Sequence, residues 1–124
     1  MLLQCEALVV HCIDYRLQGY LNKWLESNLP IQGYDRGAIA GGVHDVFYVI
    51  RQVDVAVRLH KIAKVVLINH EDCGAYGAEG NYQRHKMDLE EAGRKIEALF
   101  PKLDVETYYL HLDGRFEKMT RTNR

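Results

Sequence analysis

The sequence predicts an α/β protein in which helices cover both faces of a central, mostly parallel sheet of four to five strands. Short and almost wholly apolar runs, typical of strands buried on both faces of a parallel sheet, recur along the chain. Between them lie longer segments whose apolar residues are spaced three or four apart, as on one face of a helix. This alternation indicates right-handed crossovers and a three-layer α/β/α arrangement.

The strands and helices are expected to alternate regularly. Apolar runs predict strands near residues 6–12, 34–42, 63–70 and 104–112, the second of which runs into a glycine-rich turn. Helical spacing predicts a helix from Arg16 that stops at "SNLP", one over residues 44–61 and one from about Gln83 to Leu99. The last helix is expected to turn Leu89, Ala92, Ile96 and Leu99 inward. Residues 115–124 are expected to form a polar tail. One short edge strand can come before this tail.

Length and composition limit the classes of function. A chain of 124 residues, 48% of them hydrophobic, can bury a core of its own, so a single domain over residues 1–124 is expected. The net charge of -1 favours neither nucleic acid nor an anionic membrane as a partner. The apolar runs are too short to cross a bilayer, and the N-terminus lacks the features of an export signal. Three cysteines in such a chain predict reduced thiols and a cytoplasmic location.

Candidate metal ligands cluster at one edge of the predicted sheet. Cys12 ends the first strand and His70 ends the third, and in a doubly wound sheet these two strands are neighbours at the point where the winding reverses. Cys73 follows His70 by three residues, so one turn of backbone can direct both side chains at one ion. Two thiolates and one imidazole suit Zn²⁺ and leave a fourth position open, as in catalytic sites. Asp14 and Arg16 lie directly behind Cys12.

At these positions the sequence resembles the β-class carbonic anhydrases, in particular the small prokaryotic forms. The resemblance rests on three motifs in order, "CIDYR", "AIAGG" and "HEDCGAYG", and covers roughly residues 6 to 80. It implies a β-carbonic anhydrase-like fold, zinc bound by Cys12, His70 and Cys73, and a catalytic dyad of Asp14 and Arg16. It also implies a homodimer or a higher homo-oligomer.

The activity implied is that of a zinc lyase of the carbonate dehydratase type, the reversible hydration of CO₂ to bicarbonate by a zinc-bound hydroxide. Zinc lowers the pKa of bound water towards about 7 in such sites. Asp14 would accept a hydrogen bond from the hydroxide, and Arg16 would hold Asp14 ionised through a guanidinium–carboxylate fork. If Arg16 released it, Asp14 could become a fourth zinc ligand, as in the inactive form of some members.

The motif contexts depart from the family pattern and leave the substrate open. Ile39 precedes the Ala-Gly pair where the family often has Asn, and Asn69 precedes the metal histidine where glycine is common. Glu71 and Asp72, both acidic, separate His70 from Cys73. Relatives with the same ligands hydrolyse carbonyl sulfide or carbon disulfide, and others have no known activity. A related zinc hydrolase, or a zinc-binding homologue without catalysis, is therefore the alternative function.

The same residues allow other interpretations. Taken alone, Cys12 could be an ordinary core residue, since cysteine is often buried. A cysteine phosphatase would need arginine six residues beyond its nucleophile, where this chain has Gln18, and the glycine turn lacks the spacing of a nucleotide loop. Cys5 has no partner motif and is expected only to pack. His44 is a secondary candidate for a proton shuttle. The histidines expected to lie on the surface or to be satisfied are His11, His44, His60, His85 and His111.

Overall fold

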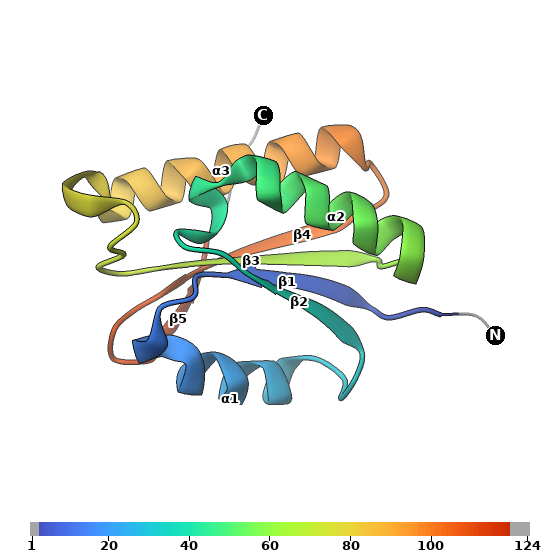
Figure 1. Cartoon of the computed structure of the whole chain (residues 1–124), viewed down its shortest axis with the longest axis horizontal. Helices are drawn as coiled ribbons and strands as arrows, with labels where there is room; N and C mark the ends of the chain where they lie inside the picture. Colours follow the sequence, from blue (N-terminus) through green and yellow to red (C-terminus); the bar gives the residue numbers. More distant parts are fainter. Residues whose placement is uncertain (1–2, 120–124) are drawn as a thin grey trace.

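The computed structural model describes residues 3–119, which form a five-stranded sheet covered by helices on both faces (Figure 1). The strands are β1 (Ala7–His11), β2 (Tyr34–Ala38), β3 (Lys64–His70), β4 (Asp104–Leu110) and β5 (Phe116–Lys118). The helices are α1 (Gln18–Asn28), α2 (Val46–His60) and α3 (Tyr82–Leu99), with 3-10 turns η1 (Tyr15–Leu17), η2 (Gly42–His44) and η3 (Gly77–Glu79). The predicted fold class is confirmed.

The strand order β2-β1-β3-β4-β5 puts the reversal of winding between β1 and β3. The first four strands are parallel, and β5 runs antiparallel to β4. Helix α1 covers one face of the sheet, while α2 and α3 cover the other (Figure 1). His11, the last residue of β1, lies opposite Ile68 of β3, so Cys12 and His70 emerge at the same carboxyl edge of the sheet. The sheet's other end, where the parallel strands begin, is its amino edge.

Two apolar layers hold the helices to the sheet. On one face, side chains of α2 and α3 pack against β1, β3 and β4 around Val53, Leu67 and Ile96, which are fully buried. On the other face, α1 buries Leu21 and Leu25 against β1 and β3. Helix α2 is rich in β-branched residues, which are weak helix formers, so this packing stabilises it more than intrinsic propensity does. Among residues 3–119, no helix has both the length and the apolar character needed to cross a membrane.

The structure differs from the sequence-based expectations at three places. Part of the expected polar tail is strand β5, and Phe116 from it stacks on Trp24 of α1 with ring centroids 5.0 Å apart. The inward stripe of α3 begins one turn earlier, at the fully buried His85, and Leu99 is 60% exposed. The expected glycine-rich turn is present but begins directly after Ala38, so β2 is shorter than expected. Residues 120–124 of the predicted tail lie outside the described residues.

Candidate metal centre

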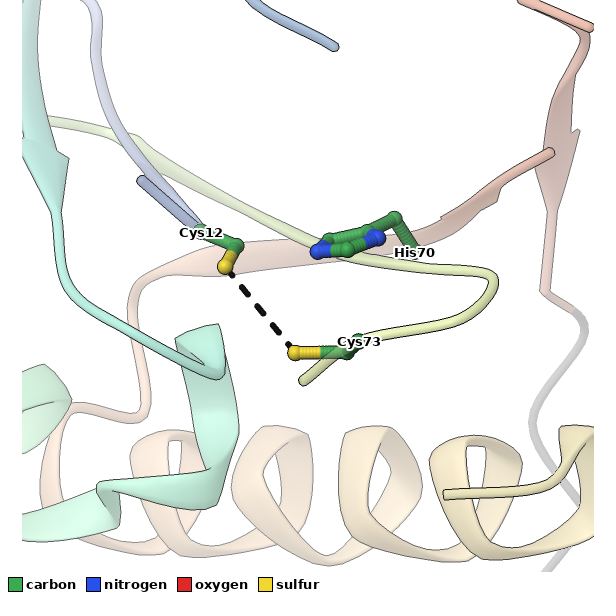
Figure 2. Close-up of side chains that lie close together, drawn as sticks. All are labelled: Cys12, His70 and Cys73. Carbon is green, nitrogen blue, oxygen red and sulfur yellow. Dashed lines mark hydrogen bonds between the residues drawn. The ribbon is translucent and has the colours of Figure 1, made fainter. Parts of the chain in front are cut away.

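Cys12, His70 and Cys73 meet at the carboxyl edge of the sheet, as predicted (Figure 2). Cys12 directly follows β1, His70 ends β3, and Cys73 lies in the turn after it. One donor atom from each residue lies within 4.8 Å of the other two, and the two sulfurs are 3.9 Å apart. Two thiolates on one tetrahedral zinc ion, each at about 2.3 Å, would be about 3.8 Å apart. The three side chains therefore have the spacing of a metal ligand set.

The orientation of His70 also fits a metal ligand. Its Nδ1 lies 2.8 Å from the Glu71 carbonyl oxygen, which can only accept, so Nδ1 carries a proton and, in the neutral ring that a metal binds, Nε2 has the free lone pair. This Nε2 is buried and has no hydrogen-bond partner among residues 3–119. Metal-binding histidines usually donate their second N–H to a carbonyl or carboxylate in this way. An unpaired buried acceptor costs free energy, and a bound cation would remove that cost.

The two thiols are electrostatically coupled. A hydrogen bond from Cys73 lowers the pKa of Cys12, and the Gly41 N–H, 3.3 Å from the Cys12 sulfur, stabilises the thiolate further. The same contact, together with burial, raises the pKa of Cys73. Burial disfavours the charged ring of His70, but the Cys12 sulfur and the Glu71 carbonyl outweigh burial and raise its pKa. Without a cation, the pair thus keeps a proton that a metal would displace.

Asp14 and Arg16 form a charge pair beside this cluster. The guanidinium donates from Nη2 to Asp14 Oδ2 over 2.7 Å and from Nε to both carboxylate oxygens, while the Arg16 backbone N–H donates to Oδ1. These bonds lower the pKa of Asp14 to about 2, so the carboxylate is ionised at neutral pH. Asp14 Oδ2 lies 3.9 Å from His70 Nε2, which places the carboxylate next to the three candidate ligands.

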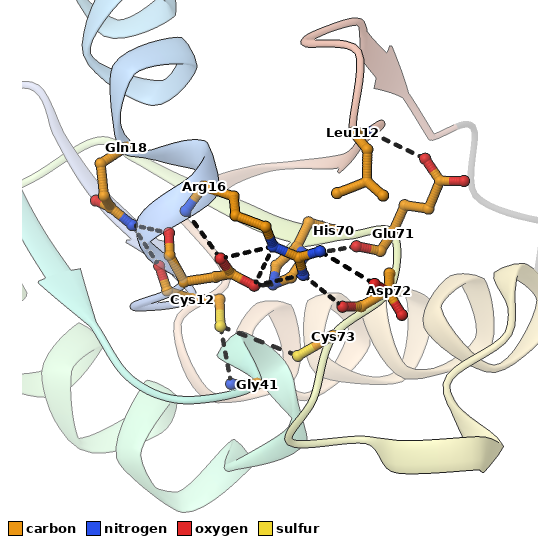
Figure 3. A network of polar contacts seen from close by, with 10 residues as sticks. Cys12, Arg16, Gln18, Gly41, His70, Glu71, Asp72, Cys73 and Leu112 are labelled. Carbon is orange, nitrogen blue, oxygen red and sulfur yellow. Dashed lines mark hydrogen bonds and ion pairs between the residues drawn. The ribbon is translucent and has the colours of Figure 1, made fainter.

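Arg16 also binds the loop that holds Cys73 (Figure 3). Its Nη1 donates to Asp72 Oδ2 over 3.0 Å, and Nη2 donates to the Asp72 carbonyl over 2.8 Å. Gln18 adds bonds from its side-chain amide to the carbonyls of Cys12 and Asp14. In the sequence, Asp72 stands out only as a departure from the family pattern, and its contact with Arg16 is not predicted. A signal for this contact was available, because Asp72 is opposite in charge to Arg16 and lies in a loop expected at the same edge of the sheet.

A buried amide explains the unusual residue before His70. The Asn69 Oδ1 accepts from the Val43 N–H over 3.1 Å, and its Nδ2 donates to the Tyr76 hydroxyl and to His85 Nδ1. A Cβ on Gly42, whose φ is +57°, would lie 2.5 Å from Asn69 Oδ1, so this turn requires glycine. Asn69 thereby joins the glycine turn, which supports Cys12, to the segment after Cys73.

His85 belongs to this region, although the sequence predicts only a surface or satisfied histidine there. It is fully buried on α3; its Nδ1 bonds to Asn69, whereas its Nε2 finds no hydrogen-bond partner in the part of the chain that the structure describes. Burial, and next the charge of His70, lower its pKa to about 4. The signal was available, because His85 lies four residues before Leu89 on the same helical stripe. His44, the secondary candidate, is exposed and lies edge-on against the Tyr76 ring, with centroids 4.4 Å apart.

Comparison with known proteins agrees with this arrangement. The family described as "Putative carbonic anhydrase" matches residues 3–120. The chain belongs to this carbonic anhydrase family. A Rickettsia bellii protein described as uncharacterized is 23% identical to it, over 94% of this chain and 82% of that protein.

Solved structures of β-carbonic anhydrases share the fold. The carbonic anhydrase of Streptococcus mutans matches with a TM-score of 0.63 and 22% identity, over 97% of this chain and 86% of that chain. A tetrameric β-carbonic anhydrase of Sordaria macrospora matches with a TM-score of 0.63 and 14% identity, over 98% of this chain and 84% of that chain. The predicted family and fold are therefore confirmed. The roles of the five predicted site residues in this carbonic anhydrase homologue stay predictions.

Proposed function

We propose that this carbonic anhydrase homologue is a zinc enzyme that catalyses the reversible hydration of CO₂ to bicarbonate. The observation that supports the proposal most strongly is the juxtaposition of three buried donors, Cys12, His70 and Cys73, with the ionised carboxylate of Asp14. Membership of the carbonic anhydrase family supports the same activity. In this proposal Cys12, His70 and Cys73 bind the metal, and the charge pair of Asp14 and Arg16 orients the water that reacts.

The donor set fits zinc better than it fits a harder cation. Thiolates and imidazole are the ligands zinc prefers, and magnesium or calcium would require oxygen ligands. Three protein ligands would leave one tetrahedral position for water or substrate. When bound, zinc would supply the Lewis acidity that makes water nucleophilic at neutral pH.

Asp14 is proposed as the group that orients the attacking water. Its carboxylate is ionised, lies next to His70 Nε2 and can accept a hydrogen bond from a water held at the fourth position. Arg16 uses its donors on both Asp14 and Asp72, so it fixes the carboxylate relative to the loop of Cys73. The bonded arrangement also turns the Asp14 oxygens toward Arg16, which opposes their binding to the metal as a fourth ligand.

We further propose that the protein acts as a homo-oligomer. Large apolar side chains are exposed in the segments around the candidate centre, with Tyr15 at 86%, Phe47 at 85% and Ile13 at 59% exposure. Exposed apolar surface of this kind is typical of a contact with another chain. The tetrameric Sordaria relative supports the same expectation.

Stopped-flow measurement of CO₂ hydration by the zinc-loaded chain tests the proposed activity. We expect turnover in the wild-type chain and a loss of at least about 100-fold in Asp14→Ala, the lower range for removal of a proton-handling group. Glu79→Ala, on an exposed carboxylate of η3, is the matched control and should keep full activity. Zinc content is measured in all three chains, so that loss of metal and loss of turnover are separated.

The same preparation decides the alternative functions. Carbonyl sulfide and carbon disulfide are offered to it in parallel assays, because the altered residues Ile39, Asn69 and Asp72 surround the candidate centre. Hydrolysis of either compound without CO₂ hydration would identify the related hydrolase. A zinc-loaded chain inactive on all three substrates would be the non-catalytic homologue and would refute the proposed activity.

A further inference from the structure

A second group of metal-binding side chains lies at the amino edge of the sheet, opposite the candidate centre. Cys5 precedes β1, Asp35 is the second residue of β2, and His60 ends α2. One donor atom from each lies within 4.8 Å of the other two. From the sequence, Cys5 is expected only to pack and His60 to be a surface or satisfied histidine. The three residues are distant in sequence, and the fold brings a sulfur, an oxygen and a nitrogen donor together.

Backbone hydrogen bonds hold these three residues in place independently of their side chains. The Cys5 N–H donates to the His60 carbonyl over 3.0 Å, which ties the N-terminal segment to the end of α2. The next residue, Glu6, donates its N–H to the Gly33 carbonyl over 2.7 Å, beside the start of β2. Asp35 is paired with Leu8 in the sheet. The site therefore needs no rearrangement of the backbone to bring its donors together.

The donor atoms are accessible and can exchange their present bonds for a metal. His60 Nδ1 lies 2.7 Å from Asp35 Oδ2, and the two side chains are 34% and 32% exposed. The Cys5 thiol makes a long contact, 3.7 Å, to the Ala7 carbonyl. Asp35 and His60 also line a surface hollow of about 260 Å³ together with Gln52. Water from this hollow can complete the coordination of an ion that the three side chains bind.

The chemistry of the donors points to one class of ion. One thiolate, one carboxylate and one imidazole form the mixed soft and hard set that suits Zn²⁺ and related divalent transition metals. The two anionic groups would balance the charge of a divalent ion. Cys5 and Cys12 lie at opposite ends of β1, seven residues apart, which is roughly 20 Å along a strand. The second group is therefore independent of the candidate centre and of the activity proposed for it.

We propose that Cys5, Asp35 and His60 form a second binding site for a divalent cation of the zinc class, completed by water. A bound ion would join the N-terminal segment to β2 and to the end of α2. It would act as a structural cross-link at the end of the sheet that lies away from the carbonic anhydrase-like centre.

Zinc stoichiometry measured by equilibrium dialysis of the full chain under reducing conditions tests this proposal. We expect two zinc ions per wild-type chain, and one each in Cys5→Ser, in Asp35→Asn and in the double variant Cys12→Ser/Cys73→Ser. His111→Ala is the matched control, because His111 also pairs with a carboxylate, Glu117, at 2.9 Å but has no cysteine in that pair. This control should keep two ions.

A stoichiometry that Cys5→Ser leaves unchanged, or that His111→Ala lowers equally, would mean adventitious surface binding and would overturn the proposal. A wild-type chain that loses its single zinc in Cys12→Ser/Cys73→Ser would overturn it as well. Circular dichroism checks the fold of each variant. If the double variant does not fold, the comparison of wild type with Cys5→Ser still decides the question.

Cobalt(II) gives a second readout that reports the sulfur ligand directly. In the Cys12→Ser/Cys73→Ser chain Cys5 is the remaining cysteine, so a sulfur-to-cobalt charge-transfer band must come from it. We expect this band to appear on titration with Co²⁺ and to vanish when His60→Ala is added. A cobalt complex without the band would exclude Cys5 as a ligand and contradict the site.

Discussion

The two edges of the sheet present similar donors in different surroundings. At the carboxyl edge, Cys12, His70 and Cys73 are 6%, 2% and 4% exposed, and His70 Nε2 is buried without a hydrogen bond to any of the described residues. At the amino edge, His60 is about one third exposed and its Nδ1 is already bonded to Asp35. A metal at the carboxyl edge would satisfy an unpaired buried atom, whereas one at the amino edge must displace an existing pair.

This difference implies an order of affinity. Burial removes competition from water and makes an unpaired donor costly, so the carboxyl edge should bind zinc more tightly. When the amino edge binds an ion, it loses the partly exposed contact between Asp35 and His60, which contributes little to stability, and water must be displaced from its donors. Four substitutions test this contrast between the two edges. Two of them change a candidate ligand or its neighbouring charge pair.

The largest effect is expected for Cys73→Ser at the carboxyl edge. Structural zinc binding is worth about 10–16 kcal/mol over its full ligand set, so one thiolate accounts for about 3–4 kcal/mol, or about 10²- to 10³-fold in affinity. Competition with a chromophoric chelator measures the change. Cys5→Ser should leave this tight site intact; equal weakening by both substitutions would contradict the separation of the two edges.

The next effect is a dependence of stability on pH that arises from His85, behind the carboxyl edge. Its pKa in the folded chain is about 4, below the ordinary value of about 6.5. Between these values the unfolded chain binds a proton that the folded chain does not. The free energy of unfolding should therefore fall by up to about 3 kcal/mol as the pH drops from 6.5 to 4.

Urea denaturation of the chelator-treated chain at several pH values measures this effect of His85. His85→Gln keeps an acceptor for Asn69 and should reduce this pH dependence, the remainder coming from His11, whose pKa burial also lowers, while His44→Gln, on an exposed side chain, should retain all of it. A pH profile of His85→Gln that matches the wild type would show that His85 is not the titrating group.

Arg16→Ala should separate catalysis from metal binding at the carboxyl edge. Its guanidinium bonds Asp14 and Asp72 and lies next to the candidate ligands without being one. We expect turnover to fall about 100-fold while zinc content stays unchanged, because the loss affects a group that handles protons and water. Metal analysis and the CO₂ assay are made on the same sample. Parallel loss of zinc and turnover would refute the division of roles.

The smallest effect is expected for Asp35→Asn in the metal-free chain. Asp35 and His60 are both about one third exposed, and pairs of this kind contribute less than about 1 kcal/mol. Urea denaturation in the presence of a chelator measures the change, and Asp54→Asn, which breaks an exposed pair with Arg58, is the control. A loss of several kcal/mol would mean that the amino edge depends on this pair without any metal.

The residue pattern alone was enough to predict the three layers and the candidate centre. Burial is visible in the sequence as a pattern of apolar residues. Continuous apolar runs predicted β1 and β3, and apolar residues at helical spacing predicted α2 and α3. Cys12, His70 and Cys73 could be placed together because the carboxyl ends of adjacent parallel strands share an edge. The order of the three motifs then indicated the carbonic anhydrase family, which the family comparison bears out.

Only the tertiary structure decided which side chains meet across the sheet. The contact of Arg16 with Asp72, the approach of Cys5 to Asp35 and His60, and the burial of His85 depend on strand register and on the direction of each side chain. Strand β5 likewise exists because β4 offers it an edge and Trp24 covers Phe116. Such contacts join residues far apart in the chain, and local periodicity does not record them.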